Sequence, residues 1–194
     1  MTIDSARGAV MNRKSMLTIL MTTAWFAVLS GLALSAQDKY AVKVPGGLAF
    51  SEFRGYESWE MIGVSRSENG PFAVILGNPT MIDALKAGIP DNGKPFPDGA
   101  RMAKMHYAQQ QLDLLPVAMV SGTQLDIDFM VKDSARFADG NGWGYAAFKR
   151  DSAGAFTPFT LQDQPPQGND AKCGVACHTA AKSRDYVFTR YATR

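Results

Sequence analysis

The stretch Arg101-Met102-Ala103-Lys104-Met105-His106-Tyr107 alternates between two sets of side chains, which is typical of a strand with two different faces. In an extended strand, successive side chains point to opposite sides of the sheet. Met102, Lys104 and His106 would therefore share one face, with the other residues on the opposite face. The stretch predicts a half-buried strand that presents a lysine and a histidine together.

The chain on both sides of this stretch gives further strand patterns. Residues 59–65 and 125–131 alternate apolar side chains with polar or small ones. Residues 72–76 form a continuous apolar run between turn-forming residues, and residues 142–148 again favour a strand. These segments predict a sheet whose strands follow one another closely along the chain.

Short helices and loops are expected between the strands. Thr80 is a candidate N-cap for a helix that stops before Gly88, and Asp133-Ser134 would cap a short helix through Phe137. Residues 90–99, with three prolines and two glycines, and the polar residues 161–172 predict loops. We expect an α+β fold, mainly an antiparallel β-sheet with a few short helices.

Residues 1–36 have the pattern of an export signal. Three basic residues precede an apolar run from 16 to 34, which ends in the small residues Ser35-Ala36. We expect cleavage near Ala36, delivery to the periplasm and one domain of residues 37–194. A retained membrane anchor is the alternative, because the run is about as long as the shortest spanning helix. The small residues at its end favour cleavage.

The charge balance excludes one class of partner. The chain has 20 Lys and Arg against 18 Asp and Glu, and residues 1–36 hold three of the basic and one of the acidic residues. The remaining chain is formally neutral. Since nucleic-acid binding needs a clustered basic surplus, we expect no nucleic-acid partner.

The clearest chemical signal is Cys173-Gly174-Val175-Ala176-Cys177-His178, which contains both cysteines and one of the two histidines. In the c-type haem signal C-x-x-C-H, two thiols attach the haem and the adjacent histidine binds its iron. Here three residues separate the cysteines. Because the insert is small and begins with glycine, we expect it to bulge outward and leave the attachment possible. The cluster predicts haem c held by Cys173 and Cys177, with His178 as iron ligand.

Other roles of the cluster remain open at this point. In an oxidising compartment the two cysteines could form a disulfide, with His178 a surface imidazole. A zinc ion could bind the same three side chains together with His106 or a carboxylate, although nothing at zinc-finger spacing supplies that fourth ligand. Thioredoxin-like exchange fits less well, because the cysteine spacing differs.

Several segments, in their order and spacing, resemble the cytochrome P-460 family, which includes the related cytochromes c′-beta. The resemblance covers most of the chain beyond residue 36. It is carried by Phe96-Pro97-Asp98-Gly99 followed by Met102 and Lys104, by Val131-Lys132-Asp133-Ser134 with Arg136-Phe137-Ala138, by the strand containing Trp143, and by the cysteine segment with Asp185-Tyr186-Val187-Phe188-Thr189 and Tyr191.

The resemblance implies a periplasmic homodimer with one haem c per chain and His178 as the proximal iron ligand. In members with the green haem, a lysine nitrogen is bonded to a meso carbon of the porphyrin, and Lys104 has that lysine's place in F-P-D-G-x-x-M-x-K. These members oxidise hydroxylamine and pass the electrons to an external acceptor. The cytochromes c′-beta lack the cross-link, line the distal side with apolar rings and bind nitric oxide. An enzyme and a nitric oxide-binding or electron-transfer protein are therefore the alternatives.

Lys104 and His106 also carry expectations from their own chemistry. Partial burial would favour a neutral, nucleophilic Lys104 amine that can add to a porphyrin, whereas most strand lysines extend to solvent. His106 could complete the iron coordination, as could Met102 or Met105 through sulfur. We expect instead an open sixth position, with His106 hydrogen-bonded at the pocket edge.

Hydroxylamine-oxidising members use a distal carboxylate that accepts protons. The candidates here are Asp126, Asp128 and Asp185, although an aspartate is more often a solvated strand or cap residue. Six aromatic residues are candidates either for walls of the pocket or for ordinary core, namely Phe50, Phe53, Trp59, Phe72, Trp143 and Phe148.

Overall fold

The structure, a computed structural model, describes residues 38–192. The predicted export signal and its cleavage near Ala36 lie outside the described residues. Within residues 38–192, none of the helices has both the length and the apolar character needed to cross a bilayer.

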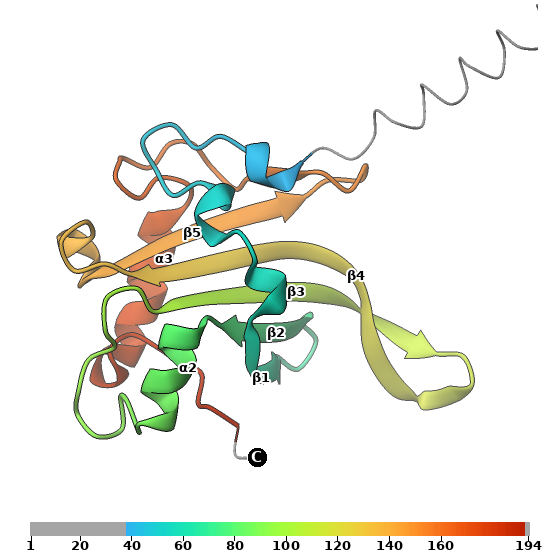
Figure 1. Cartoon of the computed structure of the whole chain (residues 1–194). Helices are drawn as coiled ribbons and strands as arrows, with labels where there is room; N and C mark the ends of the chain where they lie inside the picture. The colour runs from blue at the N-terminus through green and yellow to red at the C-terminus, as the bar shows by residue number, and fades with distance from the viewer. Residues whose placement is uncertain (1–37, 193–194) are drawn as a thin grey trace, which may run out of the picture. The chain divides into compact units, whose positions relative to one another are not determined.

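A six-stranded antiparallel sheet forms the centre of this part of the chain (Figure 1). Each strand pairs with the next along the sequence, so the order in the sheet is β1-β2-β3-β4-β5-β6. The strands are β1 Glu60–Arg66, β2 Phe72–Gly77, β3 Arg101–Leu112, β4 Leu115–Lys132, β5 Trp143–Arg150 and β6 Phe156–Pro158. The expected α+β class, mainly an antiparallel sheet with a few short helices, is confirmed.

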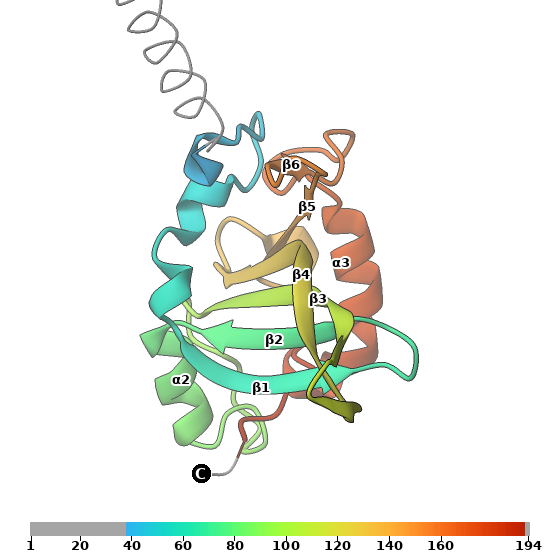
Figure 2. The same ribbon diagram turned by 90° about the vertical axis from the view of Figure 1, so that its right-hand side faces the viewer.

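Short helices cover both faces of the sheet (Figure 2). The α-helices are α2 Pro79–Lys86 and α3 Ala171–His178, and the 3-10 helices are η1 Lys39–Ala41, η2 Phe50–Phe53, η3 Tyr56–Ser58, η4 Ala138–Gly140 and η5 Thr179–Arg184. The N-terminal helices η1 to η3 lie against one face, while α3 packs against β5 on the other. The two faces of the sheet therefore have different coverings.

The alternation along β3 and β4 divides the core between these faces. On the η1–η3 face, Phe50 is fully buried, with its ring centroid 5.2 Å from that of Phe129, 4.8 Å from that of Phe148 and 5.2 Å from that of Phe156. The cluster on the opposite face includes Met102 of β3 and apolar residues of α2. The dense aromatic packing thus belongs to the face that α3 does not cover.

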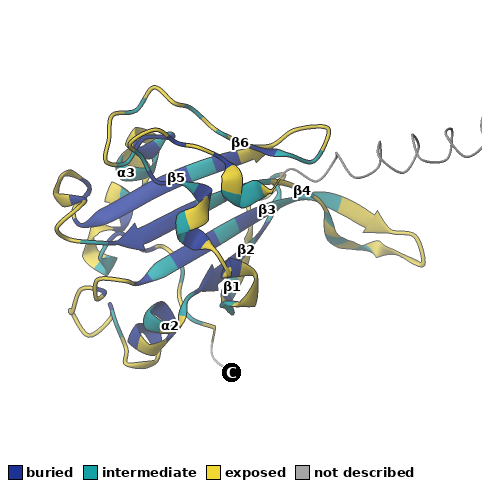
Figure 3. Cartoon of the chain, turned by 45° about the horizontal axis from the view of Figure 1, so that its top comes forward, coloured by how far each residue is buried: buried dark blue, intermediate teal, exposed yellow. Residues whose placement is uncertain are grey.

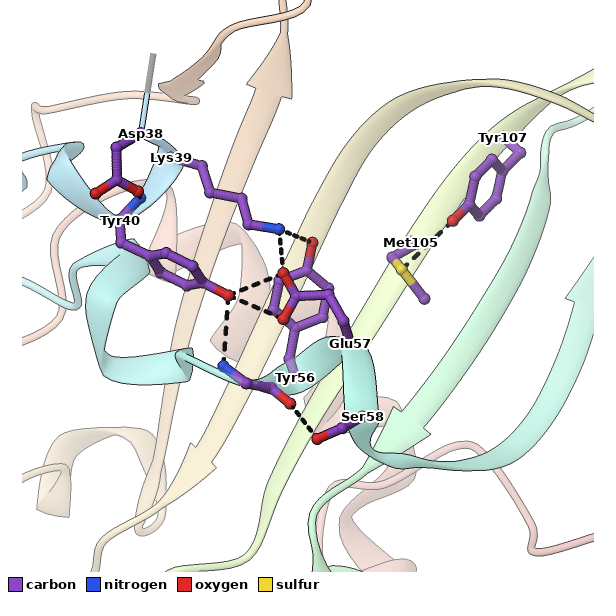
Figure 4. A network of polar contacts seen from close by, with 9 residues as sticks. Asp38, Lys39, Tyr40, Tyr56, Glu57, Ser58, Met105 and Tyr107 are labelled. Atoms are coloured by element: carbon purple, nitrogen blue, oxygen red, sulfur yellow. Dashed lines mark hydrogen bonds and ion pairs between the residues drawn. The ribbon is translucent and has the colours of Figure 1, made fainter. Parts of the chain in front are cut away.

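Polar contacts hold the N-terminal segment together (Figure 4). Lys39 Nζ donates to the Tyr56 hydroxyl at 3.1 Å and contacts the Glu57 carboxylate. The Tyr40 hydroxyl donates to Glu57 at 2.9 Å. The side chains of η1 and η3 are therefore linked, and both helices stay over Phe50.

β3 and β4 are longer than the alternating segments that predicted them. Residues 108–124 form a hairpin arm that continues past the last residues paired with β2 and β5, and most of its side chains are exposed (Figure 3). Register shifts near Tyr107 and Gln111 interrupt the pairing. Neither face of the arm is buried in the core, so its sequence shows no alternation of apolar with polar side chains, and this criterion did not predict the strand ends.

Two expected helices differ in the structure. Asn78, not Thr80, caps α2, because its side-chain oxygen accepts the Met81 N–H at 3.0 Å and Pro79 takes the first helical position. After Asp133 the chain makes one turn rather than a helix. The Phe137 N–H closes that turn on the Asp133 carbonyl at 3.0 Å, but the Phe137 backbone is not helical and the chain turns away.

Candidate functional site

A cavity of about 810 Å³ lies on the α3 side of the sheet. Its volume falls in the range of roughly 300–1,000 Å³ that is common for sites of small molecules and cofactors. β3, β4, β5, α3 and residues 187–192 contribute to its mainly apolar lining. The lining residues that bear on chemistry are Lys104, Asp128, Tyr145, Cys173, Cys177 and His178.

Both cysteines lie on α3 and line the cavity. Cys173 and Cys177 are four residues apart, one more than the cysteines of C-x-x-C-H. Residues i and i+4 of a helix share a face, as residues i and i+3 do, so the two cysteines remain on a common face. Their thiols are free and exposed. The neighbouring Asp170 raises the pKa of the Cys173 thiol through a side-chain hydrogen bond.

The expectation that residues 174–176 bulge outward is wrong. The helix continues through them, and Gly174 packs against β5. A Cβ atom at Gly174 would lie 2.6 Å from the Cβ of Tyr145, closer than non-bonded carbons approach. Glycine is therefore what lets α3 lie directly on the strand beside the cavity.

His178, the last residue of α3, is held as a defined tautomer. Its Nδ1 lies 2.6 Å from the Tyr186 carbonyl oxygen. Since a carbonyl only accepts, Nδ1 carries the proton and Nε2 keeps a lone pair. Burial lowers the pKa of His178 below its ordinary value. The positive charge of Lys104 lowers this pKa further, whereas the hydrogen bond to Tyr186 raises it. The ring lies 5.0 Å from those of Tyr145 and Phe188.

Lys104 and Asp128 face the same cavity from adjacent strands. They are direct partners in the β3–β4 register, and both line the cavity. Burial raises the pKa of Asp128 above its ordinary value, and Asp126 adds to the rise, while the charges of His106 and Lys104 oppose it. The expected common face of Met102 and Lys104 is present, since both residues line the cavity.

His106 and the two aspartates of β4 form a cluster at the edge of the site. His106 Nδ1 contacts Asp126 and lies 3.9 Å from an Asp128 oxygen. Asp128 alone of the three lines the cavity. Within residues 38–192 these side chains converge closely enough to hold a metal ion, whereas the cysteines and His178 do not form such a group. The zinc alternative for the cysteines thus finds no support in the described residues.

The third candidate proton acceptor, Asp185, lies elsewhere. Its carboxylate accepts from Lys132 Nζ at 3.0 and 3.1 Å and from the Phe96 N–H at 2.8 Å, and it is not part of the cavity lining. Met105, a candidate iron ligand, belongs to the core on the η1–η3 face. The structure therefore brings Lys104, Asp128 and His178 together but not Asp185 or Met105.

None of the six candidate wall residues lines the cavity, and all except Phe72 belong to the core or pack against it. Phe50, Phe53 and Phe148 belong to the cluster under η1–η3, Trp59 packs against it, and Trp143 lies in the other cluster. Phe72 stacks with Arg66, its ring 5.6 Å from the guanidinium carbon. The rings beside His178 are Tyr145 and Phe188, which sequence reasoning missed as wall residues. Tyr145 could have been found, because it lies two positions from Trp143 and so on the same strand face.

The comparison with protein families identifies the relatives of the chain. A family model described as Cytochrome P460 matches residues 53–189, well over half of the chain. A search of curated proteins gave no match. The matched range contains Lys104, Asp128, Tyr145, Cys173, Cys177 and His178, so the resemblance drawn from the motifs is confirmed.

The residues of the cavity fit a haem. Two thiols on one helix face lie with a neutral imidazole in a large, mainly apolar cavity, and the imidazole has its Nε2 lone pair available. Tyr145, whose pKa burial raises, keeps its phenol neutral beside them. The chain therefore belongs to the cytochrome P460 family, whose cofactor is haem.

Proposed function

We propose that this protein is an exported, periplasmic c-type cytochrome that oxidises hydroxylamine and passes the electrons to an external acceptor. Cys173 and Cys177 would bind one haem c per chain, and His178 would be its proximal ligand. The observation that supports this proposal is that a single cavity brings these three side chains together with Lys104 and Asp128. The family resemblance adds a homodimer as the expected assembly.

Each side chain has a role that its position supports. The bound haem supplies the electron-accepting iron. His178 binds that iron through Nε2 while Tyr186 holds the ring by Nδ1. Asp128 accepts protons released from the substrate, and its raised pKa brings it closer to that of an effective base near neutral pH.

Lys104 is the residue that we assign to the porphyrin cross-link. It lines the cavity from β3, at the place of the lysine in the family's F-P-D-G-x-x-M-x-K pattern. Lys104 lines the same cavity as His178 and the two cysteines. Replacing a meso hydrogen of the porphyrin by its amine nitrogen would release two protons and two electrons, and the external electron acceptor would take up the electrons. Its strand partner Asp128 would then lie close to the modified ring edge.

Nitric oxide binding or electron transfer without turnover is the second candidate. The mainly apolar lining, which includes Val187 and Phe188, favours it, because such a surface admits small neutral ligands and offers few proton acceptors. The two functions differ in whether Lys104 is bonded to the haem and whether Asp128 moves protons.

Replacing Lys104 by alanine tests the cross-link. We expect the ferrous wild-type protein to be green, with a strongly red-shifted Soret band, and Lys104→Ala to show an ordinary c-type spectrum with reduced hydroxylamine oxidation. The physical reason is that a nitrogen substituent on a meso carbon changes the porphyrin's electronic structure. Absorption spectroscopy of the reduced proteins and a hydroxylamine oxidation assay measure both effects.

Lys149→Ala is the matched control, since Lys149 is a strand lysine on β5 that does not line the cavity. Its spectrum should equal that of the wild type. An ordinary c-type spectrum in the wild type, together with tight nitric oxide binding and no hydroxylamine oxidation, would select the second function. A red-shifted band that persists in Lys104→Ala would contradict the cross-link.

The pH dependence of hydroxylamine oxidation tests Asp128 as the base. A base must be ionised to accept a proton, so the rate should fall as the pH drops through the pKa of Asp128. Because that pKa is raised, the fall should begin at a higher pH than the ordinary aspartate value of 3.8 implies. Asp128→Asn should lower the rate by about 10²–10⁴-fold, the usual contribution of such a group.

Asp113→Asn serves as the control for Asp128→Asn, because Asp113 is an exposed residue between β3 and β4, outside the cavity. It should keep both the rate and the pH profile of the wild type. An Asp128→Asn variant with the wild-type rate and acid limb would show that protons leave by another group.

A further inference from the structure

Two consecutive residues after η5 have left-handed backbone angles without being glycine. Asp185 has φ 47° and Tyr186 has φ 65°. Side chains with a Cβ atom rarely adopt such angles, and they persist only where the surrounding contacts hold them. The Asp185-Tyr186 turn is therefore maintained by something outside its own backbone.

The contacts that hold the turn come from the sheet and from the loop before β3. Lys132, the last residue of β4, donates to both Asp185 oxygens at 3.0 and 3.1 Å, and the Phe96 N–H donates to the same carboxylate at 2.8 Å. The ion pair is buried, with side-chain exposures of 6% for Lys132 and 13% for Asp185. Its ammonium also lies 5.1 Å from the centre of the Trp143 ring. A buried pair with several partners fixes geometry more firmly than a surface pair does.

The turn presents one backbone group to His178. The carbonyl of Tyr186 accepts the Nδ1 proton of His178 at 2.6 Å, a short hydrogen bond. The next residues, Val187 and Phe188, line the cavity, and the Phe188 ring lies 5.0 Å from that of His178. The Lys132–Asp185 pair is therefore connected to His178 through one carbonyl, without touching the cavity itself.

We propose that the Lys132–Asp185 ion pair positions the Tyr186 carbonyl on His178 and thereby sets the donor strength of His178 toward the haem iron. The proposal rests on the proposed role of His178 as proximal ligand. When Nδ1 of an imidazole donates a hydrogen bond, Nε2, the nitrogen that would bind the iron, becomes more basic. A more basic ligand favours ferric over ferrous iron, so the pair keeps the reduction potential low.

Neutralising the pair in the holoprotein tests this role. Asp185→Asn keeps the shape of the side chain but removes its charge, and Lys132→Met removes the cation. In both variants we expect the reduction potential to rise and the ferrous iron–histidine stretching band in resonance Raman spectra to move to lower frequency. A change of roughly tenfold in the equilibrium between ferric and ferrous protein corresponds to about 59 mV for one electron.

Two further variants separate positioning from general damage. Lys132→Arg retains a cation and should restore much of the wild-type potential and stretching frequency. Arg136→Met removes a more exposed ion pair, that of Arg136 with Glu52, and should leave both unchanged. If Lys132→Met does not fold, Asp185→Asn alone decides the proposal, because its side chain fills the same space.

The outcomes are distinct. A stretching band that is present in the wild type and unmoved in Asp185→Asn, at an unchanged potential, would overturn the role of the ion pair while leaving His178 as ligand. A wild-type holoprotein without an iron–histidine band would overturn the ligand assignment itself, and the present proposal with it.

Discussion

His178→Ala is expected to abolish the five-coordinate, histidine-bound haem iron while the haem stays attached through Cys173 and Cys177. The imidazole is the proposed proximal ligand, and its Nδ1 bond to Tyr186 leaves Nε2 as the available donor. No second histidine lines the cavity among residues 38–192. The iron–histidine stretch in resonance Raman spectra and the ferric electron paramagnetic resonance signal measure the change.

His106→Ala is the matched control, because His106 is the chain's other histidine and does not line the cavity. It should keep the iron–histidine stretch of the wild type. The ligand assignment would be wrong if His178→Ala retained that stretch, or if His106→Ala lost it.

Phe50→Ala is expected to cause the largest loss of stability among single substitutions on the η1–η3 face. Phe50 is fully buried and its ring contacts those of Phe129, Phe148 and Phe156. Removing a buried phenylalanine side chain from a core typically lowers the free energy of unfolding by about 3–5 kcal/mol. Denaturant titration followed by circular dichroism measures the change.

The haem site should be almost insensitive to Phe50→Ala, since the cavity lies on the opposite face of the sheet. The iron–histidine stretch of the folded variant should equal that of the wild type. Phe159→Ala, at a residue with 46% exposure, should change the free energy of unfolding by less than about 1 kcal/mol. Similar losses in the two variants would mean that Phe50 is not at the centre of the packing.

Much of the fold could be predicted because half-buried strands impose a two-residue period. That period identified residues 101–107 and 125–131, which lie where β3 and β4 face the core. The hairpin arm could not be found in this way, because neither of its faces is buried in the core and its sequence has no apolar–polar alternation. Helix α3 was missed because the extra residue between Cys173 and Cys177 was interpreted as part of a loop. Residues four apart are also neighbours on a helix, so the spacing is equally compatible with α3.

Part of the candidate site could be predicted, because some of its residues are of reactive or metal-binding types. Cys173, Cys177 and His178 are unusual residue types in a recognisable order, and the strand period placed Lys104. The sequence could not separate Asp128 from Asp185, because nothing in the neighbouring residues of either aspartate shows whether its carboxyl faces a cavity or an ion-pair partner. Only the tertiary structure shows that one lines the cavity while the other pairs with Lys132.

The central claim is that a haem is bonded to this chain through its two cysteines. Intact-mass spectrometry of the denatured mature protein, produced in a host that attaches haem c, tests it most directly. We predict the polypeptide mass beginning near residue 37 plus one haem. The added mass should remain in Lys104→Ala, where only the cysteines can hold the haem, and be lost in the triple variant Cys173→Ser/Cys177→Ser/Lys104→Ala. A mass equal to that of the amino acids alone would contradict the claim.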